Sequence, residues 1–326
     1  MSAGAAPAES RFAILGATGL GRALARKLAR GGTPVTLWSP EPTAPSPAGD
    51  PPLPEAVEVT GDLSLAARYD LLVLCVAAHA VRPVARALGE VARGDQVLVH
   101  AARGLEATTG LTVSAVVQEE SCLRKIGVIG GALRAGALDR GRVVAAVVAS
   151  RFDEVTSRVA ALLRSPSFRV LCSQDVPGVE IAGAYRSIAA VWIGVVDALD
   201  LGPAARAMVM TEGLSEAARL AARLGADPLT FTGYAGVGDL VATAADPAGK
   251  EHEAGAMLVR GVAPGVAGAA AVAPEAAAAA AGACVLAACL GVKVPGAEGL
   301  RRLLAEGGDA DAMLRAVFDE ISGATR

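Results

Sequence analysis

Aromatic residues are scarce in this 326-residue chain, where tryptophan, tyrosine and phenylalanine together make up 3% of the sequence. A core must therefore be built from Ala, Val and Leu side chains, which suits closely packed helices. The formal net charge is only -3, and no run of basic residues alternates with aromatic residues, so the composition gives no support to nucleic-acid binding. The length is sufficient for two domains of ordinary size.

The chain also lacks the patterns of a disulfide framework, a metal site or a membrane anchor. Its five cysteines are odd in number and form no C-x-x-C pair, which is typical of reduced thiols in the cytoplasm, and its three histidines show no metal-ligand spacing. The first ten residues, MSAGAAPAES, carry no basic residue and are not expected to be a signal peptide. Pro274 and Glu275 interrupt the apolar run Ala267–Cys289, so a buried helix and no membrane span are expected there. We therefore expect a cytoplasmic protein without a bound metal.

The most informative stretch lies near the N-terminus, where an apolar run, a glycine-rich turn, a helical pattern and a second apolar run follow one another. This order is the first half of a dinucleotide-binding unit, in which the turn backbone approaches a pyrophosphate and the helix N-terminus faces it. The predicted strands are Phe12–Leu15 and Val35–Trp38, the helix is Leu20–Arg30, and the cofactor-binding backbone is that of Gly16, Gly19, Leu20 and Gly21.

The glycine pattern departs from G-x-G-x-x-G at one position. Thr18 stands where the second glycine is expected, at the point where a pyrophosphate packs against the backbone. Gly19, one residue later, could relieve the crowding. The alternative is an ordinary strand–helix turn that needs glycine only for packing.

Strand and helix patterns alternate through the rest of the first half, which predicts a doubly wound parallel sheet covered on both faces. The further strands are expected at Val57–Val59, Leu71–Val76, Val97–His100, Ile126–Ile129, Val143–Val148 and Arg169–Cys172, and the helices at Ala80–Val91, Thr112–Glu120 and Asp153–Leu163.

Near Asp175 the strand patterns end. Long helical patterns follow at Val179–Leu199 and Ala204–Leu224, a break is expected at Gly236–Asp239, and helices resume from about Glu253 to Phe318. The fold class is therefore α/β, with an N-terminal doubly wound Rossmann-type sheet followed by an all-α C-terminal domain. We assign residues 1–175 to dinucleotide binding and 176–326 to substrate binding. The Ala-rich C-terminal helices are compatible with a homodimer.

Several segments together resemble the NAD(P)-dependent glycerol-3-phosphate dehydrogenases, in matching order and spacing over most of the chain. The segments are Ala101–Glu106, Ser165–Ile188, Leu224–Thr243 and Leu290–Pro295. The resemblance implies a small-molecule substrate, dihydroxyacetone phosphate, which is reduced with NADH or NADPH in a cleft between the two domains.

The resemblance also implies site residues, with changes at several of them. Arg103 and Arg186 replace two family lysines, of which the second is the acid/base, and Ser187 replaces an asparagine. Asp239 and Thr243 match substrate-site residues of the family. Lys250 and Glu251 replace an arginine–asparagine pair that holds the substrate phosphate, and Glu275 matches a glutamate near the cofactor.

Exchanging lysine for arginine keeps positive charge but removes proton chemistry, because an arginine stays charged and is a poor acid or base. Arg186 could still polarise a carbonyl, with the proton taken from water or from a neighbour such as Tyr185 or His252. Other readings stay open at these positions. Arg103 and Arg186 could be ion-paired without a catalytic part, and Asp239 could be a helix N-cap.

The choice of cofactor is weakly marked. An acidic residue about twenty positions beyond the glycine turn binds the ribose hydroxyls of NAD in such folds, and Glu41 lies there within a proline-rich loop. Ser39 could serve either cofactor, and no arginine closely follows Trp38 to favour NADP. The pattern slightly favours NAD over NADP.

Three hypotheses follow. The first is a divergent glycerol-3-phosphate dehydrogenase, the second an inactive or weak nucleotide-binding relative, and the third a dehydrogenase of the same scaffold for another small keto substrate. Cofactor binding without turnover would support the second, and turnover only with a non-phosphorylated keto acid would support the third.

Overall fold

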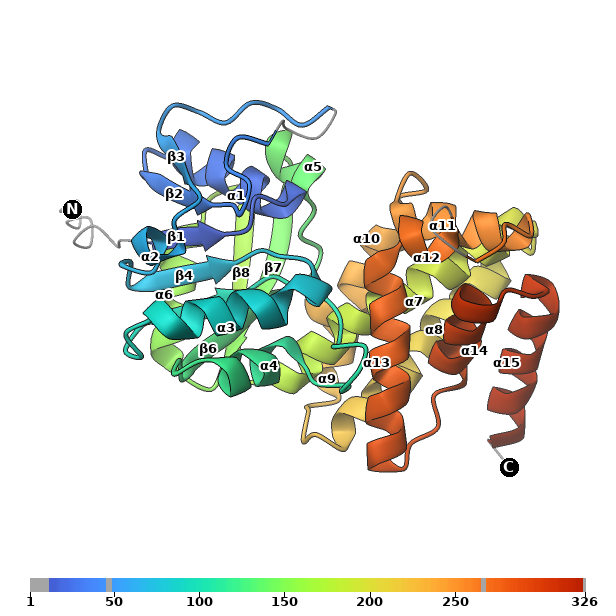
Figure 1. The fold of residues 1–326 in the computed structure, drawn as a ribbon. Coiled ribbons are helices and arrows are strands. Elements are labelled where there is room, and N and C mark those ends of the chain that lie inside the picture. The colour runs from blue at the N-terminus through green and yellow to red at the C-terminus, as the bar shows by residue number, and fades with distance from the viewer. Residues whose placement is uncertain (1–11, 45–48, 265–267, 325–326) are drawn as a thin grey trace.

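The structure, a computed structural model, describes residues 12–44, 49–264 and 268–324. The expectation for the first ten residues lies outside these ranges, as does the first residue of the Ala-rich run at 267–289. The described chain forms a sheet flanked by helices and a separate group of helices beside it (Figure 1).

One eight-stranded sheet organises the first half in the order β3-β2-β1-β4-β5-β6-β7-β8. All neighbouring strands are parallel except β6 and β7. The first six strands follow the order of dinucleotide-binding folds, in which the chain reverses its winding between β1 and β4. The strands are β1 Phe12–Leu15, β2 Val35–Trp38, β3 Val57–Thr60, β4 Leu71–Leu74, β5 Val97–His100, β6 Lys125–Gly130, β7 Val144–Ser150 and β8 Phe168–Ser173.

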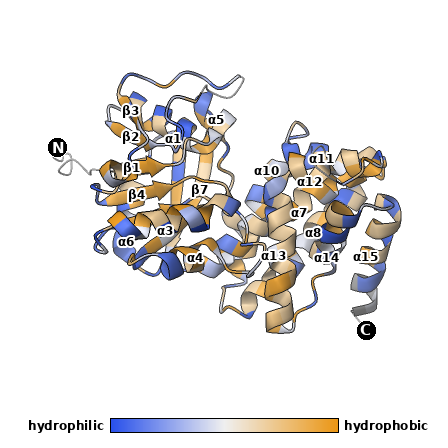
Figure 2. Ribbon diagram, in the orientation of Figure 1, coloured by the Kyte–Doolittle hydropathy of each residue, from blue (hydrophilic) through white to orange (hydrophobic). Residues whose placement is uncertain are grey.

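Helices cover both faces of this sheet. One core joins α1, α5 and α6 to one face, and a second core joins α2, α3 and α4 to the other. Both faces of the central strands are buried, and Figure 2 shows these strands to be largely hydrophobic. The helices are α1 Gly19–Arg30, α2 Leu63–Ala66, the short 3-10 turn η1 Ala78–Ala80, α3 Val81–Val91, α4 Val113–Glu120, α5 Ala135–Asp139 and α6 Asp153–Leu163.

The second half contains helices and no strand among its described residues. The long helix α7 is its centre, and α8, α11 and α13 pack around it. The predicted fold class is confirmed. The helices are α7 Val176–Ala198, α8 Gly202–Ala222, α9 Leu229–Thr232, the π-helical turn η2 Tyr234–Gly238, α10 Asp239–Ala244, α11 Lys250–Val259, α12 Ala269–Val272, α13 Pro274–Leu290, α14 Pro295–Glu306 and α15 Ala310–Ala324.

Small residues let α7 and α11 approach closely. A Cβ on Gly255 would lie 2.2 Å from the carbonyl oxygen of Val191, so only glycine permits this contact. The crossing brings the first turn of α11 against the middle of α7. By length and composition α7 is the one described helix that could cross a membrane, but its apolar window is entirely buried within the protein.

Some boundaries differ from the predictions. The strand expected at Leu71–Val76 ends at Leu74, because Cys75 and Val76 belong to the loop at the end of the sheet. The sequence pattern missed the short helices α2, α5, α9 and α10. Asp175 caps α7 by accepting the N–H of Gly178 at 2.9 Å. We propose to keep the division at residue 175, since β8 ends two residues before it.

Candidate active site

The glycine turn after β1 packs against the loop that follows β4. Gly16 has φ +116°, and a Cβ there would lie 2.6 Å from the carbonyl oxygen of Cys75. A Cβ on Gly21 would lie 2.1 Å from the carbonyl oxygen of Gly16. Packing alone therefore requires both glycines. Gly19 differs, because a Cβ there would meet nothing within 4 Å, and this glycine faces a cavity.

Thr18 has a structural role that the sequence pattern did not reveal. It is the N-cap of α1, and its hydroxyl accepts the N–H of Gly21 at 3.3 Å. The same hydroxyl donates to the carbonyl oxygen of Cys75 at 2.6 Å. Its oxygen is thus directed into the protein, where it ties the loop after β1 to the loop after β4.

A cavity of about 210 Å³ opens where the winding of the sheet reverses. It contains the N-terminus of α1 and the ends of β1, β4 and β5, which is where dinucleotides bind in such folds. The lining residues are Thr18, Gly19, Leu20, Cys75, Val76, Ala77, Ala101, Arg103, Leu133 and Glu275. Gly19, Leu20 and Glu275, all predicted near a cofactor, therefore share one cavity.

Ser39 lies at the end of β2, where the ribose of a dinucleotide is expected. Its backbone N–H donates to the carbonyl oxygen of Thr60 at 2.9 Å, and its hydroxyl accepts the N–H of Glu41 at 3.3 Å. Glu41 is exposed. Neither residue lines the cavity at the reversal point.

Two arginines from different domains, Arg103 partly buried and Arg186 buried, meet in the cleft. Arg103 follows β5, and its Nη2 donates to the carbonyl oxygens of Gly131 at 2.9 Å and Leu133 at 3.3 Å. Arg186 lies in the middle of α7 and is 6% exposed. Its Nη2 donates to the hydroxyl of Ser187 at 3.0 Å and to Oε1 of Glu251 at 2.9 Å. The sequence predicted both arginines, but it did not predict the pairing with Glu251.

Asp239 completes this cluster. It begins α10 directly after the π-helical turn, whose Gly238 N–H donates five residues back to Gly233. Asp239 is 1% exposed, and its Oδ2 lies 3.5 Å from Nη2 of Arg103. Neither carboxylate oxygen accepts a hydrogen bond from the described residues. Asp239 is not the N-cap of α10, which is Gly238.

The charges of the cluster act on one another. Burial lowers the pKa of Arg103, and the charge of Asp239 only partly offsets this. Burial also disfavours charge on Arg186, but Glu251, Asp239 and Glu275 together raise its pKa above the ordinary value. Burial by itself raises the pKa of Glu251, but the charge and hydrogen bond of Arg186, a backbone hydrogen bond and the charge of Arg103 together lower it below the ordinary value. The Arg186–Glu251 pair is therefore ionised.

The remaining predicted residues lie at different depths. Thr243 is buried and donates its hydroxyl to the backbone oxygen of Asp239 at 2.8 Å. Ser187 is buried beside Arg186. Lys250, the first residue of α11, is exposed, and it lines neither the cavity at the reversal point of the sheet nor the cleft at Arg186.

Two side chains considered as proton donors face other partners. The hydroxyl of Tyr185 donates to Oε1 of Glu216 at 3.0 Å inside the helical core, and burial raises its pKa well above the ordinary value. Nε2 of His252 lies 2.7 Å from Oδ2 of Asp197. Neither residue lines the cleft at Arg186.

Arg134 is a cleft residue that the sequence analysis missed. It follows β6, and its Nη1 donates to Oδ2 of Asp246 at 2.9 Å. Its signal was its place just beyond a strand, at the same sheet edge as the predicted site. Arg134, Arg103 and Arg186 all line a cleft of about 520 Å³.

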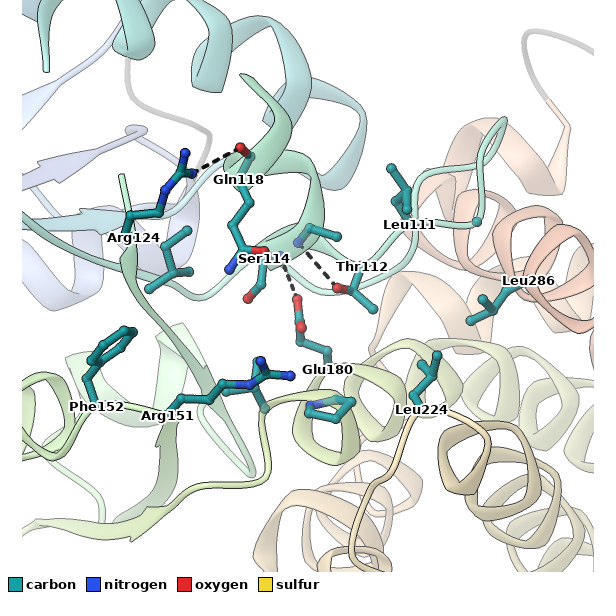
Figure 3. Close-up of a pocket in the computed structure, with 15 residues that line it drawn as sticks. Leu111, Thr112, Ser114, Gln118, Arg124, Arg151, Phe152, Glu180, Leu224 and Leu286 are labelled. Atoms are coloured by element: carbon teal, nitrogen blue, oxygen red, sulfur yellow. Dashed lines mark hydrogen bonds between the residues drawn. The ribbon is translucent and has the colours of Figure 1, made fainter. Parts of the chain in front are cut away.

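A separate cavity of about 280 Å³ lies among α4, α7 and the end of α13 and contains none of the predicted site residues (Figure 3). Polar residues of this cavity are bonded to one another and connect parts of the fold. Glu180 accepts the N–H of Ser114 at 2.8 Å and lies 3.1 Å from Nε2 of His100. This buried group joins the helical domain to the end of β5.

Comparison with known proteins agrees with this arrangement. The model of the NAD-dependent glycerol-3-phosphate dehydrogenase N-terminus matches residues 11–156, and that of the C-terminus matches residues 175–315. A protein of Moorella thermoacetica named glycerol-3-phosphate dehydrogenase [NAD(P)+] is 36% identical over 321 residues, which cover 94% of this chain and 96% of that protein. One of the same name from Macrococcus caseolyticus is 30% identical over 92% of this chain and 95% of its own length.

A solved structure is similar over nearly the whole fold. The crystal structure of glycerol-3-phosphate dehydrogenase from Coxiella burnetii superposes with a TM-score of 0.87 at 28% identity, covering 94% of this chain and 98% of that one. Both domains, in the same order, are therefore shared. The chain belongs to the NAD-dependent glycerol-3-phosphate dehydrogenase family of oxidoreductases.

Proposed function

We propose that this chain reduces dihydroxyacetone phosphate to sn-glycerol 3-phosphate with NADH or NADPH. The observation that carries the proposal is the position of Arg103, which lines both the cavity at the reversal point of the sheet and the cleft that contains Arg186. A nicotinamide in the first cavity and a ketone in the second would meet at this side chain.

The residues of the first cavity fit a dinucleotide. Gly19 leaves open space where a Cβ would stand, and Thr18 keeps its hydroxyl bonded inside the protein. The N-terminus of α1 favours an anionic pyrophosphate. When bound, the nicotinamide supplies the hydride. The exposed Glu41 is the acidic group that would meet the ribose, which supports the preference for NAD, whereas Ser39 could serve either cofactor.

In this mechanism the cationic cluster stabilises the oxygen of the substrate. The carbonyl carbon gains a C–H bond, the C=O π pair moves to oxygen, and Arg186 stabilises the resulting alkoxide. Nε of Arg186 is buried and has no hydrogen-bond partner within the described structure, and a substrate oxygen that reaches it would satisfy this donor. Water supplies the proton, because the guanidinium stays charged. We expect slower turnover than with a lysine, by about 10²–10⁴-fold.

The test is oxidation of NADH and NADPH with dihydroxyacetone phosphate by the wild type, Arg186→Lys and the matched surface control Arg124→Lys. Turnover by the wild type that is about 10²–10⁴-fold slower than that of Arg186→Lys would establish an arginine-based site without a proton-donating side chain. A silent wild type with an active Arg186→Lys variant would show that only the proton donor is lost. If both are silent while NADH binds, the proposed reaction is rejected.

A second function, nucleotide binding with little or no turnover, is supported by the Arg186–Glu251 pair. Glu251 neutralises the cation that would polarise the substrate, and a carboxylate near a phosphate site repels the substrate. Glu251→Asn separates the two functions. It should increase turnover if the pair merely slows a dehydrogenase, and it should leave a nucleotide-binding protein silent.

A further inference from the structure

The cleft carries an excess of positive charge on the side of the nucleotide-binding domain. Its two lining carboxylates are both paired, Glu251 with Arg186 and Asp246 with Arg134. Its volume is about 520 Å³. The five lining arginines are Arg103, Arg134, Arg140, Arg142 and Arg186.

The helical domain offers little to an anionic group. Lys250, which stands where the family carries its phosphate-binding arginine, is exposed and lies outside the cleft lining. Arg186 is only 6% exposed, is paired with Glu251 at 2.9 Å, and is assigned above to the carbonyl oxygen of the substrate. An anion bound in this cleft therefore needs a cation from elsewhere.

Arg134 provides such a cation with an unused donor. Its side chain is 29% exposed, and its only ion pair among the described residues is the single contact from Nη1 to Asp246. Its Nε is shut off from solvent and has no hydrogen-bond partner in the described structure. A buried donor without a partner is unfavourable, and a ligand that accepts from it removes that cost.

Two more arginines extend this wall outward. Arg140 and Arg142 are exposed at the mouth of the cleft, and neither makes an ion pair with any residue in the described ranges. The guanidinium of Arg140 lies against Gly136, where a Cβ would be 3.3 Å from both Nη atoms. Such a group of cations attracts phosphate esters into the cleft.

We propose that Arg134 binds the phosphate group of the substrate. This inference rests on the proposed function and gives a specificity-determining role to the loop after β6. The anion site thereby moves from the helical domain, where Lys250 lies outside the cleft, to the nucleotide-binding domain. The fork of an arginine suits a phosphate monoester, since two N–H groups can donate to two of its oxygens.

The test compares Arg134→Gln and Arg134→Lys with Arg124→Gln, a control at an exposed arginine outside the cleft. Binding of sn-glycerol 3-phosphate and of inorganic phosphate is measured by calorimetry in the presence of saturating NAD, and KM and kcat are measured with dihydroxyacetone phosphate. Arg134→Gln should weaken binding and raise KM by about 10- to 100-fold, with kcat changed far less. Arg134→Lys should restore part of the affinity, and the control should match the wild type.

The inference is overturned if Arg134→Gln binds both probes within twofold of the wild type, or if its affinity for NADH falls as much as its affinity for the phosphates. A wild type that binds neither probe also overturns it. Arg134-dependent binding without turnover rejects the proposed reaction and keeps the anion site. Normal turnover that is insensitive to substitution of Arg134 keeps the proposed reaction and rejects the anion site.

Discussion

The cavity at the reversal point of the sheet and the cleft at Arg186 differ in how their polar groups are satisfied. At the nucleotide turn the hydroxyl of Thr18 is bonded within the protein, at 2.6 Å from the carbonyl oxygen of Cys75. On the substrate side the opposite holds. In the described ranges, every buried side-chain nitrogen or oxygen without a hydrogen bond belongs to Arg134, Arg186 or Asp239.

At the nucleotide turn the hydroxyl of Thr18 is hydrogen-bonded within the protein, whereas at the cleft several buried polar atoms have no hydrogen-bond partner among the described residues. Buried polar groups in native proteins are nearly always paired, so exceptions gathered at one place indicate a site that water or a ligand completes. The turn of the cofactor side is held by packing and internal hydrogen bonds. The cleft at Arg186 instead contains charged groups whose hydrogen-bonding capacity is only partly used. We therefore expect mutations at the two places to affect the stability of the fold and the binding of ligands to different extents.

The largest effect on stability is expected at the Arg186–Glu251 pair. Arg186→Met leaves a largely buried carboxylate without its partner, which should lower the free energy of unfolding by about 3–5 kcal/mol. The double variant Arg186→Met/Glu251→Met should recover most of that loss. Urea unfolding measures both. Equal destabilisation of the single and double variants would show that the two charges are not coupled.

On the cofactor side, Gly16→Ala and Gly19→Ala should behave in opposite ways. Gly16→Ala forces a Cβ against a backbone oxygen at φ +116° and should destabilise the fold by about 1–3 kcal/mol. Gly19→Ala meets no protein atom, so the melting temperature should stay within a few degrees while NADH binding weakens about tenfold. Thermal unfolding and fluorescence titration check the pair. Unchanged NADH affinity in Gly19→Ala would contradict the assignment of the cavity.

Asp246→Asn tests whether Arg134 binds the phosphate of the substrate. Removing the carboxylate that holds Nη1 leaves the guanidinium free for a phosphate. We expect KM for dihydroxyacetone phosphate to fall by about two- to fivefold, since exposed ion pairs are weak. Steady-state kinetics at low ionic strength measure this, with Asp153→Asn, at an exposed aspartate outside the cleft, as the control. A rise in KM would mean that Asp246 orients Arg134 for the substrate.

The smallest effect is a change in the pH dependence of stability. The pKa of Glu251 is lower in the folded state than in the unfolded state, because Arg186 stabilises its charge. Its contribution is therefore complete above the unfolded pKa of about 4.3 and is lost as the pH falls through the folded value. Between pH 6 and pH 3, the wild type should lose more free energy of unfolding than Glu251→Gln. Parallel curves would show that the pair does not contribute.

The sequence was sufficient for the fold because the fold depends on local patterns. Apolar runs and helical periodicity located all eight strands and the long helices, and the fold class and family are confirmed. Short helices such as α5 were missed, since five residues are too few to show a period.

The site was harder to predict because it depends on contacts between distant residues. Arg103, Arg186 and Asp239 were placed by resemblance, and the structure brings them together, although their roles stay predictions. The partner of Arg186 lies 65 residues away, and Arg134 lies 112 residues from Asp246. No spacing within one segment signals such pairs. In the sequence pattern Thr18 stands where a pyrophosphate would pack, and only the fold shows that its hydroxyl is bonded to the carbonyl oxygen of Cys75.

The π-helical turn before Asp239 makes the direction of this side chain sensitive to the length of the turn. A π turn is an α-helix with one extra residue, and Gly236 permits it because a Cβ there would lie 2.1 Å from the carbonyl oxygen of Phe231. Deleting one residue of the turn would rotate Asp239 by about 100° about the helix axis and carry its carboxylate away from Arg103. Because Leu240 follows Asp239 in the same helix and belongs to the helical core, a single-codon deletion would disturb the position of the carboxylate and the packing of α10 together.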